Sequence, residues 1–130
     1  MLKLNKKSGS RKKQDDEEHR IQTAMVNWFR LQYPKMRHNL FAVPNGGRRD
    51  AVSGARLKAE GVLAGVADLI LLKSNRFYGA LLIETKTRTG KQRESQKEWE
   101  AKITADGYKY VIVRSLDDFM KEVKSYLGDM

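Results

Sequence analysis

Three charged residues interrupt two apolar runs of this chain, and their types and spacing could support hydrolysis of a phosphodiester. Asp68 lies inside the run 65–72, and Glu84 and Lys86 end the run 80–86. Burying an ionised carboxylate without a partner is strongly unfavourable, so such groups tend to be paired, bound to a metal ion or placed at the end of a strand. A divalent cation would satisfy both Asp68 and Glu84.

The segment between the two runs favours an antiparallel pair of strands. Residues 73–79 are mostly polar and end in glycine, which is typical of a turn between neighbouring strands. Such a pair would bring Asp68 beside Glu84, and the alternation of side chains along a strand puts Glu84 and Lys86 on one face. Two carboxylates that hold Mg²⁺ or Mn²⁺, with a lysine nearby, form a site for in-line cleavage of a phosphodiester.

The hydrophobic pattern of the remaining chain predicts the elements that position these residues. Ile21, Met25 and Phe29 recur at helical spacing, and Pro34 marks the end of their helix. The other expected elements are a strand over 40–43, a short helix over 48–60, a helix over 92–106, a strand over 108–113 and a helix over 116–127. This order indicates an α/β fold with a mixed central β-sheet flanked by helices on both faces.

Composition indicates one domain with a polyanionic partner. The chain has 130 residues, 40% of them hydrophobic, and a net charge of +10, so nucleic acid is the expected partner. No run approaches the roughly 20 apolar residues of a membrane-spanning helix, and no glycine-rich nucleotide-binding motif is present. The chain lacks cysteine and an apolar leader, so we expect a cytoplasmic protein.

Two basic segments are candidates for binding that partner. Residues 1–14 are predicted to be a disordered basic arm before a domain over 15–130, and the arm either contacts DNA or is a solvated tail. The turn after residue 43 could bring backbone N–H groups and arginines to a phosphate, or it could be an ordinary turn. The candidate nucleic-acid-binding residues are Asn45, Gly46, Arg48, Arg49, Arg56 and Lys58.

The segments around these charges resemble one nuclease family. The pattern D-x(n)-E-x-K is that of the PD-(D/E)xK nuclease superfamily. Segments 18–22, 43–48 and 57–68, followed by Gln96, stand in an order that closely resembles the virus-type replication-repair nuclease (VRR-NUC) family in its short stand-alone form. The resemblance covers roughly residues 17–127 and implies a restriction-endonuclease-like core. Ala67 stands where the family often has proline, a change of backbone geometry rather than of chemistry.

The resemblance also implies a role for individual residues. It makes Asp68 and Glu84 ligands of Mg²⁺ or Mn²⁺, with the Thr85 carbonyl as a further ligand, and it makes Lys86 the catalytic lysine. From the residues alone, Lys86 could instead be an exposed partner of Glu84 in an ion pair of little energetic value.

Two residues outside this cluster gain a role from the resemblance. It places Glu18 near the metal as a helix-borne acid, and it makes Gln96 the glutamine of the helix after the lysine. On the pattern alone, Glu18 could simply complement the helix dipole, and Gln96 could be a surface residue.

The expected function is that of a divalent-metal-dependent structure-specific DNA endonuclease, with four-way (Holliday) junctions as the leading substrate. The alternatives are a flap or nonspecific nuclease and a catalytically silent DNA-binding module. Because a junction is nearly two-fold symmetric, we expect a homodimer. Exposed apolar residues near the first or the last helix, such as Trp28, Tyr33 or Tyr126, could form its interface, and the periodicity does not say which.

Overall fold

A four-stranded mixed sheet forms the centre of the described structure. The computed structural model describes residues 2–44 and 51–130, and the side chains of residues 12–44 and 53–130. The strands are β1 (Leu40–Ala42), β2 (Leu69–Leu71), β3 (Leu81–Thr85) and β4 (Lys109–Val113), in the order β1-β2-β3-β4. Strand β2 pairs antiparallel with both β1 and β3, and β4 pairs parallel with β3. The predicted antiparallel pair is confirmed, with Leu69 opposite Ile83.

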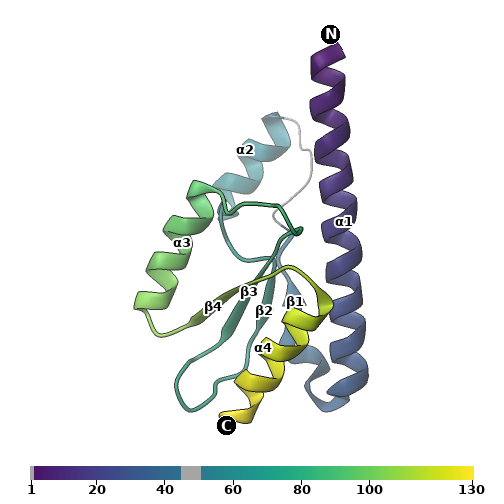
Figure 1. Ribbon diagram of the computed structural model, residues 1–130. Helices are drawn as coiled ribbons and strands as arrows, with labels where there is room; N and C mark the ends of the chain where they lie inside the picture. Colours follow the sequence, from purple (N-terminus) through teal and green to yellow (C-terminus); the bar gives the residue numbers. More distant parts are fainter. Residues whose placement is uncertain (1, 45–50) are drawn as a thin grey trace.

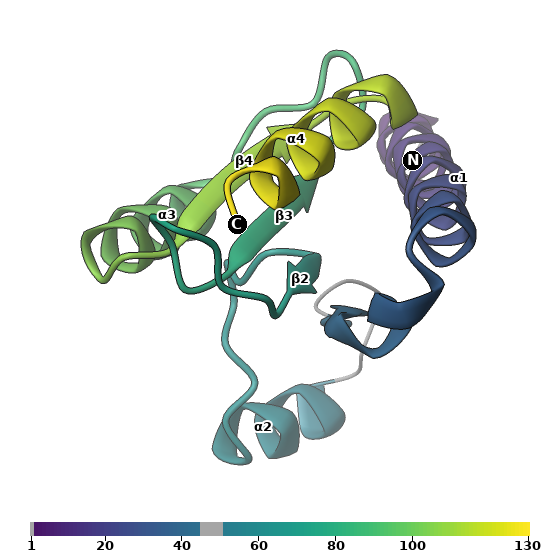
Figure 2. The ribbon, with the colours of Figure 1, turned by 90° about the horizontal axis from the view of Figure 1, so that it is seen from below.

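Helices cover both faces of this sheet, as the sequence predicts. They are α1 (Leu2–Gln32), α2 (Ala51–Ala59), α3 (Glu94–Ala105) and α4 (Leu116–Gly128), with a 3₁₀ segment, η1, at Pro34–Asn39. Figures 1 and 2 show α1 and α4 together on one side and α3 on the opposite side. Proline lacks a backbone N–H donor, which explains why α1 ends before Pro34. Gly107, with φ of 98°, ends α3 as predicted.

The alternation of side chains along β3 divides the core into two clusters. Leu81 and Ile83 pack with α1 and α4, whereas Leu82 packs on the side of α3. The first cluster also contains Met25, Phe29, Leu40, Leu69, Leu71, Val113, Phe119, Val123 and Tyr126. The second contains Ala67, Ala80, Leu82 and Tyr110, with Trp99 and Ile103 of α3 against them. Each large apolar side chain buried in this way stabilises the fold by about 1.5–3 kcal/mol.

Helix α1 extends further toward the N-terminus than the pattern predicts. The structure continues the helix through residues 2–14, where composition predicts a disordered arm. Lysine, arginine and glutamine have good helix propensity, and Lys12 and Lys13 stand four residues before Asp16 and Glu17, a spacing that stabilises a helix. The domain boundary at Asp15 and the contact of the arm with DNA stay predictions.

The aromatic residues predicted at a dimer interface pack inside the protomer. Tyr126 is 1% exposed, and its hydroxyl donates to the Lys73 carbonyl at 2.6 Å, so its prediction as an exposed residue is wrong. The reason is helical spacing, because Tyr126 follows Val123 by three residues on the inward face of α4. Trp28 and Tyr33 are half-buried, with ring centroids 5.8 Å apart, and pack against the first core cluster.

Among the described residues, no helix is both long and apolar enough to span a membrane.

Candidate active site

The structure brings Asp68, Glu84 and Lys86 together at one end of β3. The Thr85 backbone N–H donates to Asp68 Oδ2 at 2.8 Å, so the carboxylate that precedes β2 lies against the end of β3. Lys86 Nζ lies 3.9 Å from Glu84 Oε2, on the same face as the alternation predicts. Glu84 is 2% exposed and Lys86 is 6% exposed. Glu84 and Lys86 therefore form a buried pair rather than a surface ion pair, with the half-buried Asp68 beside them.

Gln96 of α3 holds the Glu84 carboxylate from the facing helix. Its side-chain amide donates to Glu84 Oε2 at 2.9 Å, and its carbonyl oxygen accepts from the Arg93 backbone N–H at 2.8 Å. The side chain therefore reaches into the cluster, and the possibility that it is a surface residue does not hold. Its contact is with the acid rather than with Lys86.

Close packing of two backbone segments brings α3 to this position. Gly65 has φ of 94°, and a Cβ built on it would overlap the Ser95 carbonyl group, with Gln96 N only 3.1 Å away. Only glycine permits both the left-handed conformation and this approach. The loop before Asp68 and the first turn of α3 are thus fixed against each other.

Tyr110 of β4 is a second partner of Glu84, and sequence reasoning missed it. Its hydroxyl lies 3.5 Å from Glu84 Oε1, a long hydrogen bond, and also accepts from Gln92 Nε2 at 3.2 Å. Burial raises the pKa of Tyr110. In the register, Glu84 pairs with Ile112, two residues after Tyr110, so both side chains face α3. That register was not deducible before the pairing of β3 with β4 was known.

Electrostatics show that this cluster is short of positive charge. Burial and, next, the neighbouring Asp68 carboxylate together raise the pKa of Glu84 to about 9, against the opposing effect of the Lys86 ammonium. Burial also raises the pKa of Glu18. The Lys86 ammonium lowers this pKa, and the Asp68 carboxylate raises it. Glu18 on α1 is therefore within electrostatic reach of the same group, as the resemblance implies.

These donors fit a hard divalent cation. Mg²⁺ prefers oxygen ligands and is usually held by one or two carboxylates together with water. Asp68 and Glu84 supply two carboxylates next to each other, and the Thr85 carbonyl is the candidate further ligand. Within residues 2–44 and 51–130, no three His, Asp or Glu side chains lie close enough together to hold a metal ion by themselves. Backbone or water oxygens would complete the coordination.

The candidate nucleic-acid-binding residues are only partly described. Arg56 and Lys58 are exposed on α2, which lies outside the two helical layers in Figures 1 and 2. The Val43 N–H donates to the Asp68 carbonyl at 2.8 Å, so the strand that leads into the predicted phosphate loop passes beside Asp68. Asn45, Gly46, Arg48 and Arg49 lie outside the described residues.

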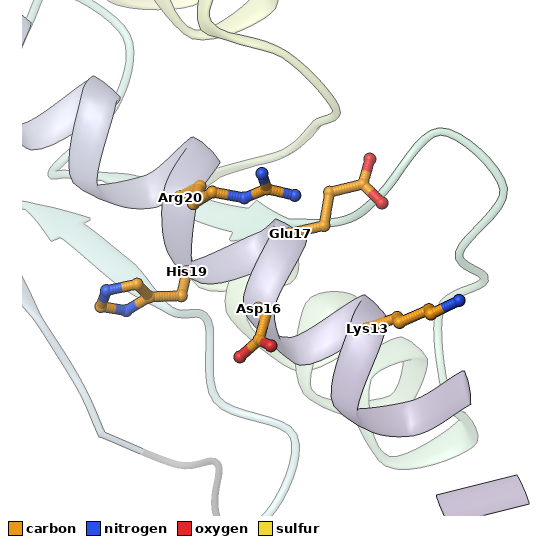
Figure 3. Close-up of a pocket in the computed structure, with 5 residues that line it drawn as sticks. All are labelled: Lys13, Asp16, Glu17, His19 and Arg20. Carbon is orange, nitrogen blue, oxygen red and sulfur yellow. The ribbon is translucent and has the colours of Figure 1, made fainter. Parts of the chain in front are cut away.

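A surface hollow on α1 does not coincide with the charged cluster. It has a volume of about 600 Å³ and is lined by Lys13, Asp16, Glu17, His19 and Arg20. Figure 3 shows these side chains spread around α1 rather than converging on one point. Asp68, Glu84 and Lys86 do not line this hollow, so it does not define the candidate site.

Comparison with known proteins agrees with this geometry. The family model of the VRR-NUC domain matches residues 8–117, beginning within the predicted arm. A solved structure described as a "VRR_NUC domain protein" superposes with a TM-score of 0.76 at 26% identity, over 86% of this chain and 88% of that chain. No curated protein matches. The acids and the lysine at the end of β3, the mixed sheet and the family match together establish that the chain belongs to the VRR-NUC family of nucleases, with its restriction-endonuclease-like α/β fold.

Proposed function

We propose that this protein is a divalent-metal-dependent, structure-specific DNA endonuclease that hydrolyses phosphodiester bonds of four-way (Holliday) junctions. Membership of the VRR-NUC family supports nuclease activity and a DNA substrate. The observation that carries the site assignment is the burial of Glu84, 2% exposed, beside Asp68. A buried carboxylate beside a second acid, with one nearby lysine, is costly to keep, and such groups cluster at functional sites.

The residues of the cluster divide the chemistry among them. Mg²⁺ or Mn²⁺ held by Asp68, Glu84 and the Thr85 carbonyl would supply positive charge against the charge that develops on the phosphate. Asp68 Oδ2 accepts the Thr85 N–H, which fixes the carboxylate and leaves Oδ1 as an acceptor. Gln96 fixes Glu84 in the same way through Oε2. Both carboxylates are thus oriented before substrate arrives.

Lys86 is the chain's own cation at this site. Its ammonium lies 3.9 Å from Glu84 in a buried environment, where its charge acts more strongly than in water. We assign it the stabilisation of charge on the attacked phosphate or assistance in removing a proton from the attacking water. Glu18 adds a half-buried carboxylate from α1 near the metal, and burial raises its pKa.

The two-fold symmetry of a four-way junction underlies the proposed homodimer. Resolution needs a cut on each of two strands, and the described chain has one cluster of this kind. Two protomers related by a two-fold axis would present two matched sites. The buried Tyr126 takes no part in the interface. Sedimentation equilibrium at micromolar concentration should give about twice the protomer mass of 15.0 kDa. A monomer both free and on junction DNA would exclude the dimer.

Cleavage of a panel of labelled DNAs tests the function. Linear, flap and four-way substrates are incubated with Mg²⁺, with Mn²⁺ or with EDTA. We expect paired nicks in the four-way junction, slower cutting of the other substrates and none in EDTA. Equal cutting of all three would indicate a nonspecific nuclease, and preference for the flap a flap nuclease. Binding without cleavage under either metal would indicate a silent DNA-binding module.

A further inference from the structure

Arg114 closes the turn that follows Lys86. Its Nη1 donates to the Thr87 carbonyl at 2.7 Å and to the Gly90 carbonyl at 2.6 Å, with a longer contact of 3.4 Å to the Arg88 carbonyl. The turn has its own bond from the Gly90 N–H to Thr87 Oγ1 at 3.1 Å. A single guanidinium thus binds the carbonyls at both ends of this turn.

Arg114 is itself held by the end of the sheet. Its backbone N–H donates to Asp118 Oδ2 at 3.0 Å in the first turn of α4. The Lys86 N–H donates to the Val113 carbonyl at 3.0 Å, so the parallel pairing of β3 with β4 continues up to Arg114. A Cβ added to Gly90 would lie 3.6 Å from Lys86 Cδ, which shows that the turn packs on the lysine stem.

The loop held in this way is strongly basic. Residues 87–93 include Arg88, Lys91 and Arg93, all exposed, and contain no acidic residue. Gln92, which lies between Lys91 and Arg93, turns inward, and its side-chain amide donates to Glu100 Oε1 at 2.8 Å. The Arg93 backbone N–H donates to Gln96 Oε1 at 2.8 Å, and the Gln96 amide donates to Glu84 Oε2, so this end of the loop lies near the acids of the site.

We propose that residues 87–93, held by Arg114, form a preformed binding surface for the phosphates of the DNA strand beside the scissile bond. Arg88, Lys91 and Arg93 make the phosphate contacts, and Arg114 is a positioning residue. This inference rests on the proposed function and assigns substrate contacts to its site. The occupant is the sugar-phosphate backbone rather than the bases, because the loop carries fixed positive charge and no aromatic side chain to stack on a base.

The test measures DNA affinity without requiring cleavage. Glu84→Gln protein in EDTA is titrated with labelled junction and linear DNA at several salt concentrations. The loop variant carries Arg88→Gln, Lys91→Gln and Arg93→Gln. A matched control carries Arg30→Gln, Arg76→Gln and Lys121→Gln, exposed residues outside the loop, and so loses the same number of charges.

We expect Kd of the loop variant to rise at least about ten-fold, and the slope of log K against log salt to fall by about 2–3, near 0.9 for each lost contact. Kd of the control variant should rise less than about three-fold, because its residues make few phosphate contacts that release counterions from the DNA. Equal losses in the two variants would overturn the proposal, as would parental affinity in the loop variant. Failure of the unaltered protein to cleave any DNA would overturn only the proposed function.

Arg114 is tested by the conservative replacement. Arg114→Lys keeps the charge, but an ammonium cannot reproduce the planar fork of a guanidinium. We expect Arg114→Lys to weaken binding as much as Arg114→Gln, with faster hydrogen exchange at the Gly90 amide in both. Parental affinity in Arg114→Lys would show that only charge matters, and it would overturn the positioning role.

Discussion

The two halves of one buried stretch, residues 81–83 and residues 84–87, differ in chemistry while sharing the same burial. Leu81, Leu82 and Ile83 are at most 5% exposed, and Glu84, Thr85, Lys86 and Thr87 are at most 6% exposed. The apolar half packs between helices and stabilises the sheet. The polar half occupies an equally dry place with groups that water would solvate better.

The polar half is therefore maintained at a cost in stability. Thr85 Oγ1 has no hydrogen-bond partner in the described part of the chain, and burial with a neighbouring carboxylate raises the pKa of Glu84. Strained or uncompensated groups that persist in a fold tend to mark functional sites. The contrast teaches that composition along a buried strand, rather than burial itself, separates its core from its site.

The largest expected effect is loss of cleavage on removing either acid. Glu84→Gln and Asp68→Asn each keep the side-chain shape but remove a candidate ligand charge, so cleavage should be abolished while DNA binding persists. Single-turnover cleavage and gel-shift titrations measure the two properties. Glu98→Gln, at an exposed acid of α3, is the control and should behave as the parent. Full activity in Glu84→Gln would show that residues 84–87 are not a catalytic site.

Replacement of the buried lysine should have the next largest effect. Lys86→Ala is expected to lower kcat at least about 100-fold, because the ammonium acts on charge that develops in the transition state. KM should change little, and Lys97→Ala, at an exposed lysine of α3, should change neither constant. If Lys86→Ala raises KM with kcat intact, the residue only binds substrate.

A matched pair of glycines tests how the loop before Asp68 meets α3. Gly65→Ala adds a Cβ that overlaps the Ser95 carbonyl group, whereas Gly61→Ala has a similar φ of 103° and nothing within 4 Å. Both variants carry backbone strain of about 1 kcal/mol, and the overlap should add about 2 kcal/mol in Gly65→Ala alone. Urea unfolding measures both, and equal stabilities would show that the close approach does not hold α3 in place.

Part of this architecture follows from local pattern. The apolar runs around Asp68 and Glu84 predict the antiparallel pair, because alternation and a polar turn are local features. Asp68, Glu84 and Lys86 stand inside those runs, so the candidate metal site is also predicted from local features. The inward position of Tyr126 also follows from its spacing from Val123 on α4, so the prediction of an exposed Tyr126 is wrong for a local reason.

The rest depends on pairing between distant segments. Tyr110 and Arg114 reach the site because the chain passes through α3 after β3 and returns as β4, which lies parallel to β3. No local signal sets that register, so Tyr110 near Glu84 and the carbonyls held by Arg114 could not be foreseen. Gln96 was placed by family resemblance, whereas its bond to Glu84 follows from the packing of α3.

The smallest effect in this series is a gain of stability. In EDTA near pH 8, Glu84→Gln should be more stable than the parent, and the difference should shrink toward pH 5. Burial and the neighbouring Asp68 carboxylate raise the pKa of Glu84 from 4.5 to about 9, so the folded protein holds a proton that the unfolded chain releases. Parental stability therefore falls as pH rises between these values, and the variant lacks this fall. Urea unfolding near pH 5 and pH 8 measures the difference. A variant less stable near pH 8 would mean that ionised Glu84 stabilises the fold.

Calorimetric titration of Mn²⁺ into the DNA-free protein tests most directly whether the polar half of the stretch is a metal site. The parent should bind Mn²⁺ saturably, and Glu84→Gln should lose that binding, because two adjacent carboxylates are reduced to one. The exposed-acid variant Glu98→Gln should bind as the parent does. Equal Mn²⁺ binding by the parent and by Glu84→Gln, or no binding by the parent, would contradict the account.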